Sequence, residues 1–126
     1  MSAAAFAAVG AGAVLGAWAR WGLGLWLNPA TPNLPLGTLA VNVAGGYLIG
    51  LAVAYFDSNA YLSPEWRLFC ITGFLGAMTT FSTFSAEAMQ LLQAEKYLAA
   101  GLHSGAHLLG AILATILGFA TYRALA

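Results

Sequence analysis

Five hydroxyl side chains gather within a short part of an otherwise apolar stretch of the chain. They are Thr79, Thr80, Ser82, Thr83 and Ser85. A single Ser or Thr in a membrane helix usually returns its hydrogen bond to the carbonyl one turn earlier, but five together, beside Gly73 and Gly76, predict a locally broken helix. Such breaks are tolerated where the freed backbone groups line a cavity or hold an ion. A half-helix starting near Thr79 would direct N–H groups toward an anion, and the freed carbonyls would suit a small cation.

Two phenylalanines flank the central hydroxyls at a spacing that puts both rings on one helix face. Phe81 and Phe84 are three residues apart, with Ser82 and Thr83 between them. Because an aromatic ring is electropositive at its edge, two ring edges beside hydroxyl donors form a coordination set for a small, strongly hydrated anion. The alternative is that both rings only pack against lipid or against the protein core.

Two further polar residues fall inside apolar stretches. Asn42, in TLAVNVAGG, carries an amide that can donate two hydrogen bonds to an anion, or that instead joins two helices. Glu87 follows the hydroxyl cluster, and an ionisable residue inside a membrane span is a functional candidate by default. It lies toward the end of its stretch, so a position in a vestibule, or one that snorkels to the interface, is also open.

The only two histidines, His103 and His107, are four residues apart and therefore share a helix face. This spacing can bind a metal, but Ser104 stands where the zinc hydrolases have a glutamate after the first histidine. We therefore favour a polar stripe along a pathway, which Thr115 extends by two turns. No nucleophile and base occur with a positioned acid, so catalysis is not expected.

Arg20 lies among Trp18, Trp21 and Trp26, as is typical of a membrane interface. Its charge could draw anions into a vestibule, or it could simply anchor the helix end.

The composition excludes a soluble protein. Eight formal charges in 126 residues make up 6% of the chain, against about 25% in a soluble domain, while 61% of the residues are apolar. The net charge of zero argues against nucleic acid as a partner. The chain is therefore expected to be an integral, multi-pass membrane protein whose principal surroundings are the lipid bilayer.

The uncharged stretches predict an all-α protein with four transmembrane helices in a single domain. A helix needs about 20 largely apolar residues to cross a bilayer, and Pro29, Pro32 and Pro35 divide a stretch that is too long for one crossing. The predicted spans are roughly 4–27, 37–56, 67–93 and 98–124, with the third broken near its middle.

The basic residues give no preferred orientation in the membrane. With four spans, Arg67 and Arg123 lie on one side, and Arg20 and Lys96 lie on the other. Without a Lys/Arg bias, the positive-inside rule favours neither topology. The hypothesis is insertion in both orientations, giving an antiparallel homodimer. Three G-x-x-x-G pairs, which favour close helix packing within or between subunits, agree with it; they are Gly12/Gly16, Gly46/Gly50 and Gly101/Gly105.

The strings GFLGAMTTFSTFSAE (73–87), GTLAVNVAGG (37–46) and GAWARW (16–21) resemble the small bacterial fluoride channels, the Fluc or CrcB family. The resemblance covers all four spans in order. It implies a dual-topology, antiparallel homodimer in the bacterial inner membrane, with two pores that export fluoride passively. A small proton-coupled transporter that uses Glu87 is the alternative function.

The resemblance also implies roles for individual residues. Positions matching the fluoride pore are Asn42, Phe81, Ser82, Thr83, Phe84, Glu87, His107 and Thr115, and those whose backbone carbonyls hold a central sodium ion are Gly76 and Thr79. The chain departs from the family at two places. Ala111 stands where many members have a serine, and His103 stands where another polar or aromatic residue is common.

Overall fold

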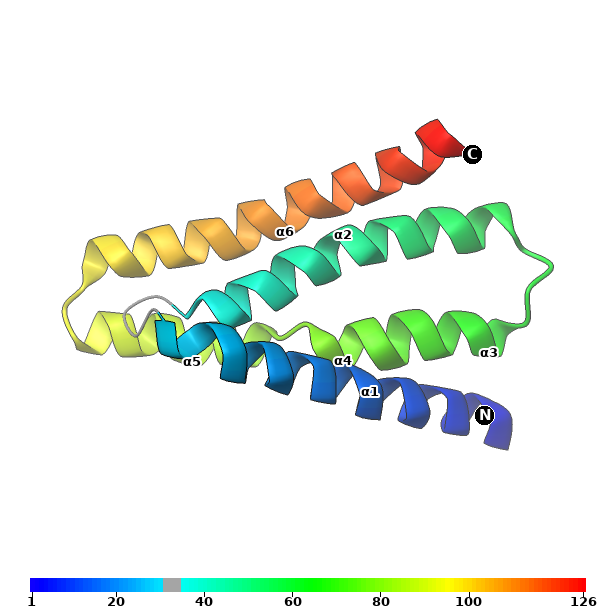
Figure 1. Cartoon of the computed structure of the whole chain (residues 1–126), viewed down its shortest axis with the longest axis horizontal. Helices are drawn as coiled ribbons and strands as arrows, with labels where there is room; N and C mark the ends of the chain where they lie inside the picture. Colours follow the sequence, from blue (N-terminus) through cyan, green and yellow to red (C-terminus); the bar gives the residue numbers. More distant parts are fainter. Residues whose placement is uncertain (31–34) are drawn as a thin grey trace.

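The computed structural model describes residues 1–30 and 35–126, and the described chain is all-helical (Figure 1). Its elements are α1 (Ala3–Leu27), η1 (Asn28–Ala30), α2 (Leu36–Ser58), α3 (Pro64–Arg67), η2 (Leu68–Leu75), α4 (Gly76–Met78), α5 (Phe81–Gln93) and α6 (Tyr97–Leu125). Four helical segments are long and apolar enough to cross a membrane, as the sequence predicted: α1, α2, the run Pro64–Gln93 and α6. The largest difference from a predicted boundary is in the third segment, which begins at Pro64 rather than at residue 67.

The third segment is broken at Thr79 and Thr80, as the hydroxyl cluster predicted. Both residues are extended, with φ/ψ of −80°/154° at Thr79 and −149°/116° at Thr80. The second half-helix begins at Phe81 rather than near Thr79, because the Thr80 hydroxyl caps it by accepting a hydrogen bond from the Thr83 N–H (3.1 Å). The break therefore has a defined start and end.

The π-helix η2, just before the break, was not predicted. Apart from Thr72, the side chains of its residues, LFCITGFL, are apolar or absent, so their periodicity does not distinguish a π-helix from an α-helix. Helix α1 packs against this segment through Gly12 and Gly16, where an added Cβ would overlap the carbonyl oxygens of Phe69 and Phe74.

Helices α2 and α6 also pack backbone to backbone. An added Cβ at Gly50 would overlap the Thr115 carbonyl oxygen, and one at Gly118 would overlap that of Tyr47. Glycine at such positions lets two membrane helices approach closely. Gly101 and Gly105, by contrast, have nothing within 4 Å of an added Cβ, so this third pair is not used for packing among the described residues.

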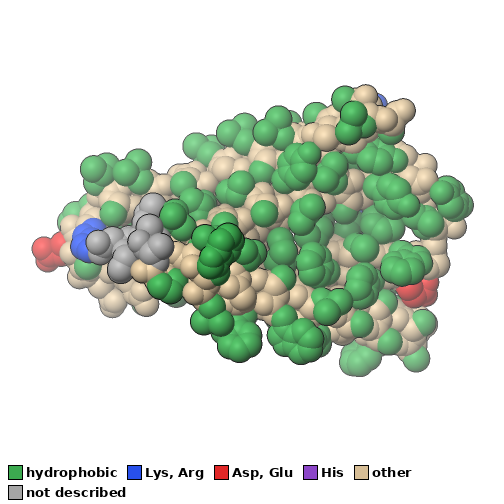
Figure 2. Space-filling view, viewed as in Figure 1, with side chains coloured by type: hydrophobic (Ala, Val, Ile, Leu, Met, Phe, Trp, Pro, Cys, Tyr) green, Lys and Arg blue, Asp and Glu red, His purple; other side chains and the backbone are tan. Residues whose placement is uncertain are grey.

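The outside of the molecule is apolar and part of its inside is polar. Figure 2 shows hydrophobic side chains over most of the visible face, and residues such as Trp26 (75% exposed) and Leu98 (78%) point outward. Four polar residues are buried instead: Thr38, Thr80, His103 and His107. This distribution fits surroundings of lipid, with the polar chemistry kept between the helices.

A side-chain hydrogen bond joins the two ends of the link between α1 and α2. Asn28 Oδ1 accepts a hydrogen bond from the Gly37 N–H (2.7 Å). Pro29 lies in η1 and Pro35 precedes α2, as expected of a proline-rich turn. The remaining part of that predicted turn, including Pro32, lies outside the described residues.

Candidate functional site

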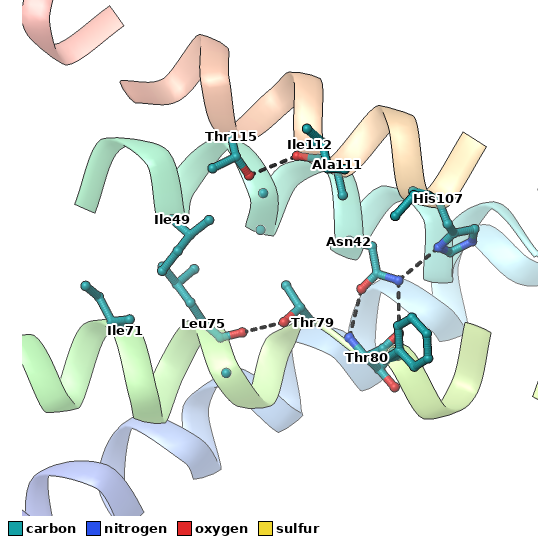
Figure 3. A pocket seen from close by; sticks show the side chains of 15 residues that line it. Asn42, Ile49, Ile71, Leu75, Thr79, Thr80, His107, Ala111, Ile112 and Thr115 are labelled. Atoms are coloured by element: carbon teal, nitrogen blue, oxygen red, sulfur yellow. Dashed lines mark hydrogen bonds between the residues drawn. The ribbon is translucent and has the colours of Figure 1, made fainter. Parts of the chain in front are cut away.

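Asn42 of α2 joins the break to α6. Its Oδ1 accepts a hydrogen bond from the Thr80 N–H (2.8 Å), and its Nδ2 donates to the Thr80 carbonyl (3.0 Å). The same Nδ2 also lies 2.9 Å from Nδ1 of His107, within hydrogen-bonding distance (Figure 3). The sequence left two roles open for Asn42. The structure shows the one that joins two helices, and in it both amide hydrogens are engaged.

The break leaves the carbonyls of residues 76–79 without their usual helical donors, and for Gly76 and Thr79 those donors have other partners. In a continuous helix, the Thr80 N–H would bond the Gly76 carbonyl and the Thr83 N–H would bond the Thr79 carbonyl. Here the first bonds Asn42 and the second bonds the Thr80 hydroxyl. The oxygens of Gly76 and Thr79 are thus candidate ligands for a small cation.

A cavity of about 380 Å³ lies beside the break, between α2, the third segment and α6 (Figure 3). Asn42, Phe81, His107 and Thr115 all line it, together with both residues of the candidate cation site. Ala111 also lines the wall and accepts the Thr115 hydroxyl through its carbonyl (2.9 Å). His107 and Thr115 of the sequence-predicted stripe on α6 therefore face one cavity, with an apolar gap at Ala111, whereas His103 does not line it.

Arg20 borders a second, larger cavity of about 880 Å³. Trp18 and Trp21 line its outer part, and Thr80 and Thr83 line it beside the break. This cavity connects the one arginine of α1 with the hydroxyl cluster, which is the arrangement that a vestibule requires.

The five hydroxyls divide into two groups. Thr79 and Ser85 return their hydrogen bonds to carbonyls one turn earlier, at 2.9 and 2.8 Å. Thr80 Oγ1 instead pairs with Thr83 Oγ1 (3.0 Å) and with Ser82 Oγ (3.3 Å). Ser82 and Thr83 are exposed on the outside of the single chain.

The two phenylalanines are placed differently. Phe81 is 76% exposed and meets Phe84 with ring centroids 5.3 Å apart and an angle of 66° between the planes. The Phe84 ring lies against the two imidazoles, with centroids 4.8 Å from His107 and 5.5 Å from His103, both tilted by 31°. The Phe84 ring is therefore in contact with Phe81 and with both histidines.

Glu87 is held inside the molecule by partners on two other helices. Thr38 of α2 donates its hydroxyl hydrogen to Oε1 (2.5 Å), and Nε2 of His103 on α6 lies 3.3 Å from Oε2. The Glu87 side chain is only 12% exposed and that of His103 only 2%. Glu87 therefore neither snorkels to the membrane interface nor lines the vestibule beside Arg20.

One residue of this site, and the role of another, were missed from the sequence. Thr38 lies one helical turn before Asn42, so the shared face was the available signal. Thr80 was counted among the hydroxyls, but its backbone contact to Asn42 and its capping role could not be anticipated without the tertiary fold.

Comparison with known proteins gives one consistent result. The family described as "CrcB-like protein, Camphor Resistance (CrcB)" matches residues 7–119. The chain is 56% identical over 123 residues to "Fluoride-specific ion channel FluC" of Ralstonia pickettii (strain 12J), covering 98% of each chain. It is 60% identical over 115 residues to the protein of the same name from Thiobacillus denitrificans (strain ATCC 25259 / T1), covering 91% of this chain and 93% of the relative.

The buried Glu87–His103 contact predicts coupling between the two side chains. The His103→Phe variant keeps a ring but leaves Glu87 Oε2 without its neighbour, which should lower the free energy of unfolding by about 1–3 kcal/mol. In the Glu87→Gln background the same change should cost less, since a neutral amide is cheaper to leave buried. Denaturant unfolding in detergent micelles measures the four proteins of this cycle. Equal costs in both backgrounds would show that the two side chains act independently.

Proposed function

Because the chain belongs to the CrcB-like protein family, we propose that it is a fluoride-selective ion channel of a bacterial inner membrane. It is not an enzyme. The observation that carries the proposal is the break at Thr79–Thr80, pinned by Asn42 beside the Phe81 and Phe84 rings. Neutral hydroxyls, N–H groups and ring edges favour a small anion there without a basic residue.

The anion enters through the vestibule beside Arg20, whose charge raises the local anion concentration. From there it reaches the Ser82 and Thr83 hydroxyls and the edges of the two phenylalanine rings. His107 and Thr115, on the wall of the second cavity, continue the polar surface beyond the break. Glu87 lies next to this route. Its carboxylate is paired with Thr38 and His103, so it presents no unpaired charge to the anion.

The functional unit we propose is an antiparallel homodimer with two pores. Ser82, Thr83 and the 76% exposed Phe81 lie on the outside of one chain at the middle of its third span, where hydrocarbon would leave the hydroxyls poorly satisfied. A second copy would cover this surface and complete the wall of each pore. The equal division of basic residues between the two sides supports insertion in both orientations.

A sodium ion at the centre of this dimer is part of the proposal. The carbonyl oxygens of Gly76 and Thr79 have lost their helical donors, and carbonyl oxygen is a ligand that hard cations prefer. Two such carbonyl oxygens from each subunit would bind the ion and hold the two helix breaks against each other. The ion would supply positive charge near the anion route and add a subunit contact.

Fluoride efflux from liposomes that contain the purified protein tests the function. Fluoride should leave rapidly, chloride should not, and a pH gradient should have no effect. Phe81→Leu and Phe84→Leu should each lower the flux by about tenfold, since an aliphatic side chain has no electropositive edge. Thr121→Val is the matched control, because the Thr121 hydroxyl only returns to the Leu117 carbonyl (2.7 Å). Flux that requires a proton gradient would instead support a transporter that uses Glu87.

Reporter fusions at the C-terminus test dual topology. A reporter active only in the cytoplasm and one active only outside should both give signal, because neither orientation is favoured by charge. Adding two lysines after Ala126 should shift the balance toward a cytoplasmic C-terminus. A single active reporter on the unaltered chain would refute insertion in both orientations.

The sodium content of the purified dimer tests the cation site. Atomic emission after buffer exchange into N-methyl-D-glucamine should find one sodium ion per two chains, retained because the ion is enclosed by backbone oxygens. Prolonged exchange that removes the ion should weaken the dimer in detergent. A dimer that never contains sodium, yet conducts fluoride, would contradict this assignment.

A further inference from the structure

The orientation of the Asn42 amide is fixed by the backbone of one residue. Thr80 presents its N–H and its carbonyl to the two ends of the amide, at 2.8 Å from Oδ1 and 3.0 Å from Nδ2. Turning the amide over would place oxygen against oxygen and hydrogen against hydrogen. The nitrogen of Asn42 must therefore be the atom that faces His107.

This orientation determines which nitrogen of His107 carries the proton. An amide nitrogen donates hydrogen bonds and accepts none, so Nδ1 of His107, 2.9 Å away, must accept. The proton of the neutral ring then lies on Nε2. The other neutral tautomer and the doubly protonated ring would each direct an N–H at the Asn42 N–H group.

The resulting Nε2–H group of His107 is buried and has no hydrogen-bond partner among the described residues. His107 is 4% exposed. The titratable groups nearby are Glu87 of α5 and His103 of α6, and a ligand atom of each lies within 4.8 Å of one from His107. Those two face each other at 3.3 Å, whereas Nε2 of His107 has no described group at hydrogen-bonding distance.

We propose that Asn42 is a positioning residue, which holds His107 in the Nε2–H tautomer so that the pore offers the anion a neutral N–H donor. The identity of that anion rests on the fluoride channel proposed above. In this arrangement Asn42 acts on the anion through His107, because both of its own amide hydrogens are engaged.

The same arrangement argues against a metal at this cluster. Two imidazoles and a carboxylate form a ligand set that zinc uses, and three atoms within 4.8 Å of one another invite that interpretation. A metal at Nε2 of His107 would require the proton to move to Nδ1, against the Asn42 N–H. Coordination would therefore have to break the contacts between Asn42 and Thr80.

The tautomer can be measured directly by ¹⁵N NMR of histidine-labelled protein in lipid without fluoride. Only two histidines are present, and a His107→Gln sample assigns the signals. We expect Nε2 of His107 to carry the proton in the unaltered protein. In Asn42→Asp, which replaces the donor by an isosteric acceptor, the proton should move to Nδ1. An Nδ1–H or doubly protonated His107 in the unaltered protein would overturn the proposal, whatever the flux.

Two amide variants at position 107 test which ring nitrogen of His107 donates to the anion during flux. The amide nitrogen of glutamine reaches about as far as Nε2, whereas that of asparagine reaches only as far as Nδ1. His107→Gln should therefore conduct about tenfold better than His107→Asn, the effect of one hydrogen bond. Equal flux in the two variants would contradict the Nε2–H donor.

Zinc alone tests the competing assignment, a metal site formed by Glu87, His103 and His107. Addition of Zn²⁺ should leave fluoride flux through the unaltered protein unchanged, with Thr121→Val as the matched control. A zinc block that disappears in both His103→Phe and His107→Gln would overturn the tautomer assignment in favour of a metal site. Absence of fluoride flux from the unaltered protein would refute the proposed function instead, while the NMR result would still decide the tautomer.

Discussion

The structure depends on a pair of hydrogen bonds between one side-chain amide and one residue of backbone. Two extended residues in the middle of a membrane helix expose donors and acceptors that lipid cannot satisfy, at a cost of several kcal/mol for each group. Asn42 satisfies both exposed groups of Thr80, and the Thr80 hydroxyl satisfies the next half-helix. The carbonyls of Gly76 and Thr79, whose helical donors are bonded elsewhere, are the proposed ligands of an ion. In the proposed channel, stability and function would share the same few atoms.

Close packing of α2 on α6 brings the parts of this site together. Gly50 and Gly118 remove the side chains that would hold the two backbones apart. His107 is thereby brought within 2.9 Å of Asn42, while Glu87 on α5 reaches Thr38 and His103. Polar groups from three separate helices thus lie against one another inside a protein whose outer surface is apolar. Glycine spacing is consequently as important to the site as the polar residues are.

Much of this arrangement could be predicted from the sequence, and the remainder has identifiable physical reasons. Long apolar stretches define the spans, and a cluster of hydroxyls beside glycine defines the break, because both are properties of local sequence. The partners of Glu87 are not local, since Thr38 precedes it by 49 positions and His103 is on another helix. The π-helix before the break was missed because the side chains of LFCITGFL are almost all apolar or absent. For the Asn42 amide the sequence left two roles open, anion donor or link between helices, and only the fold shows that its hydrogens already face Thr80 and His107.

Transport through the proposed pore depends on the membrane voltage because its side chains, such as Ser82, Thr83 and Phe84, are neutral. A pore lined by neutral donors carries no proton or counter-ion across with the anion, so every fluoride ion that passes moves one full negative charge. An interior-negative voltage then drives the ion outward with about 2.3 kcal/mol for each 100 mV. By the rule of about 1.4 kcal/mol per factor of ten, this holds internal fluoride some forty- to fifty-fold below the external concentration. The cell's existing voltage does the work, and no fuel is consumed at the channel itself.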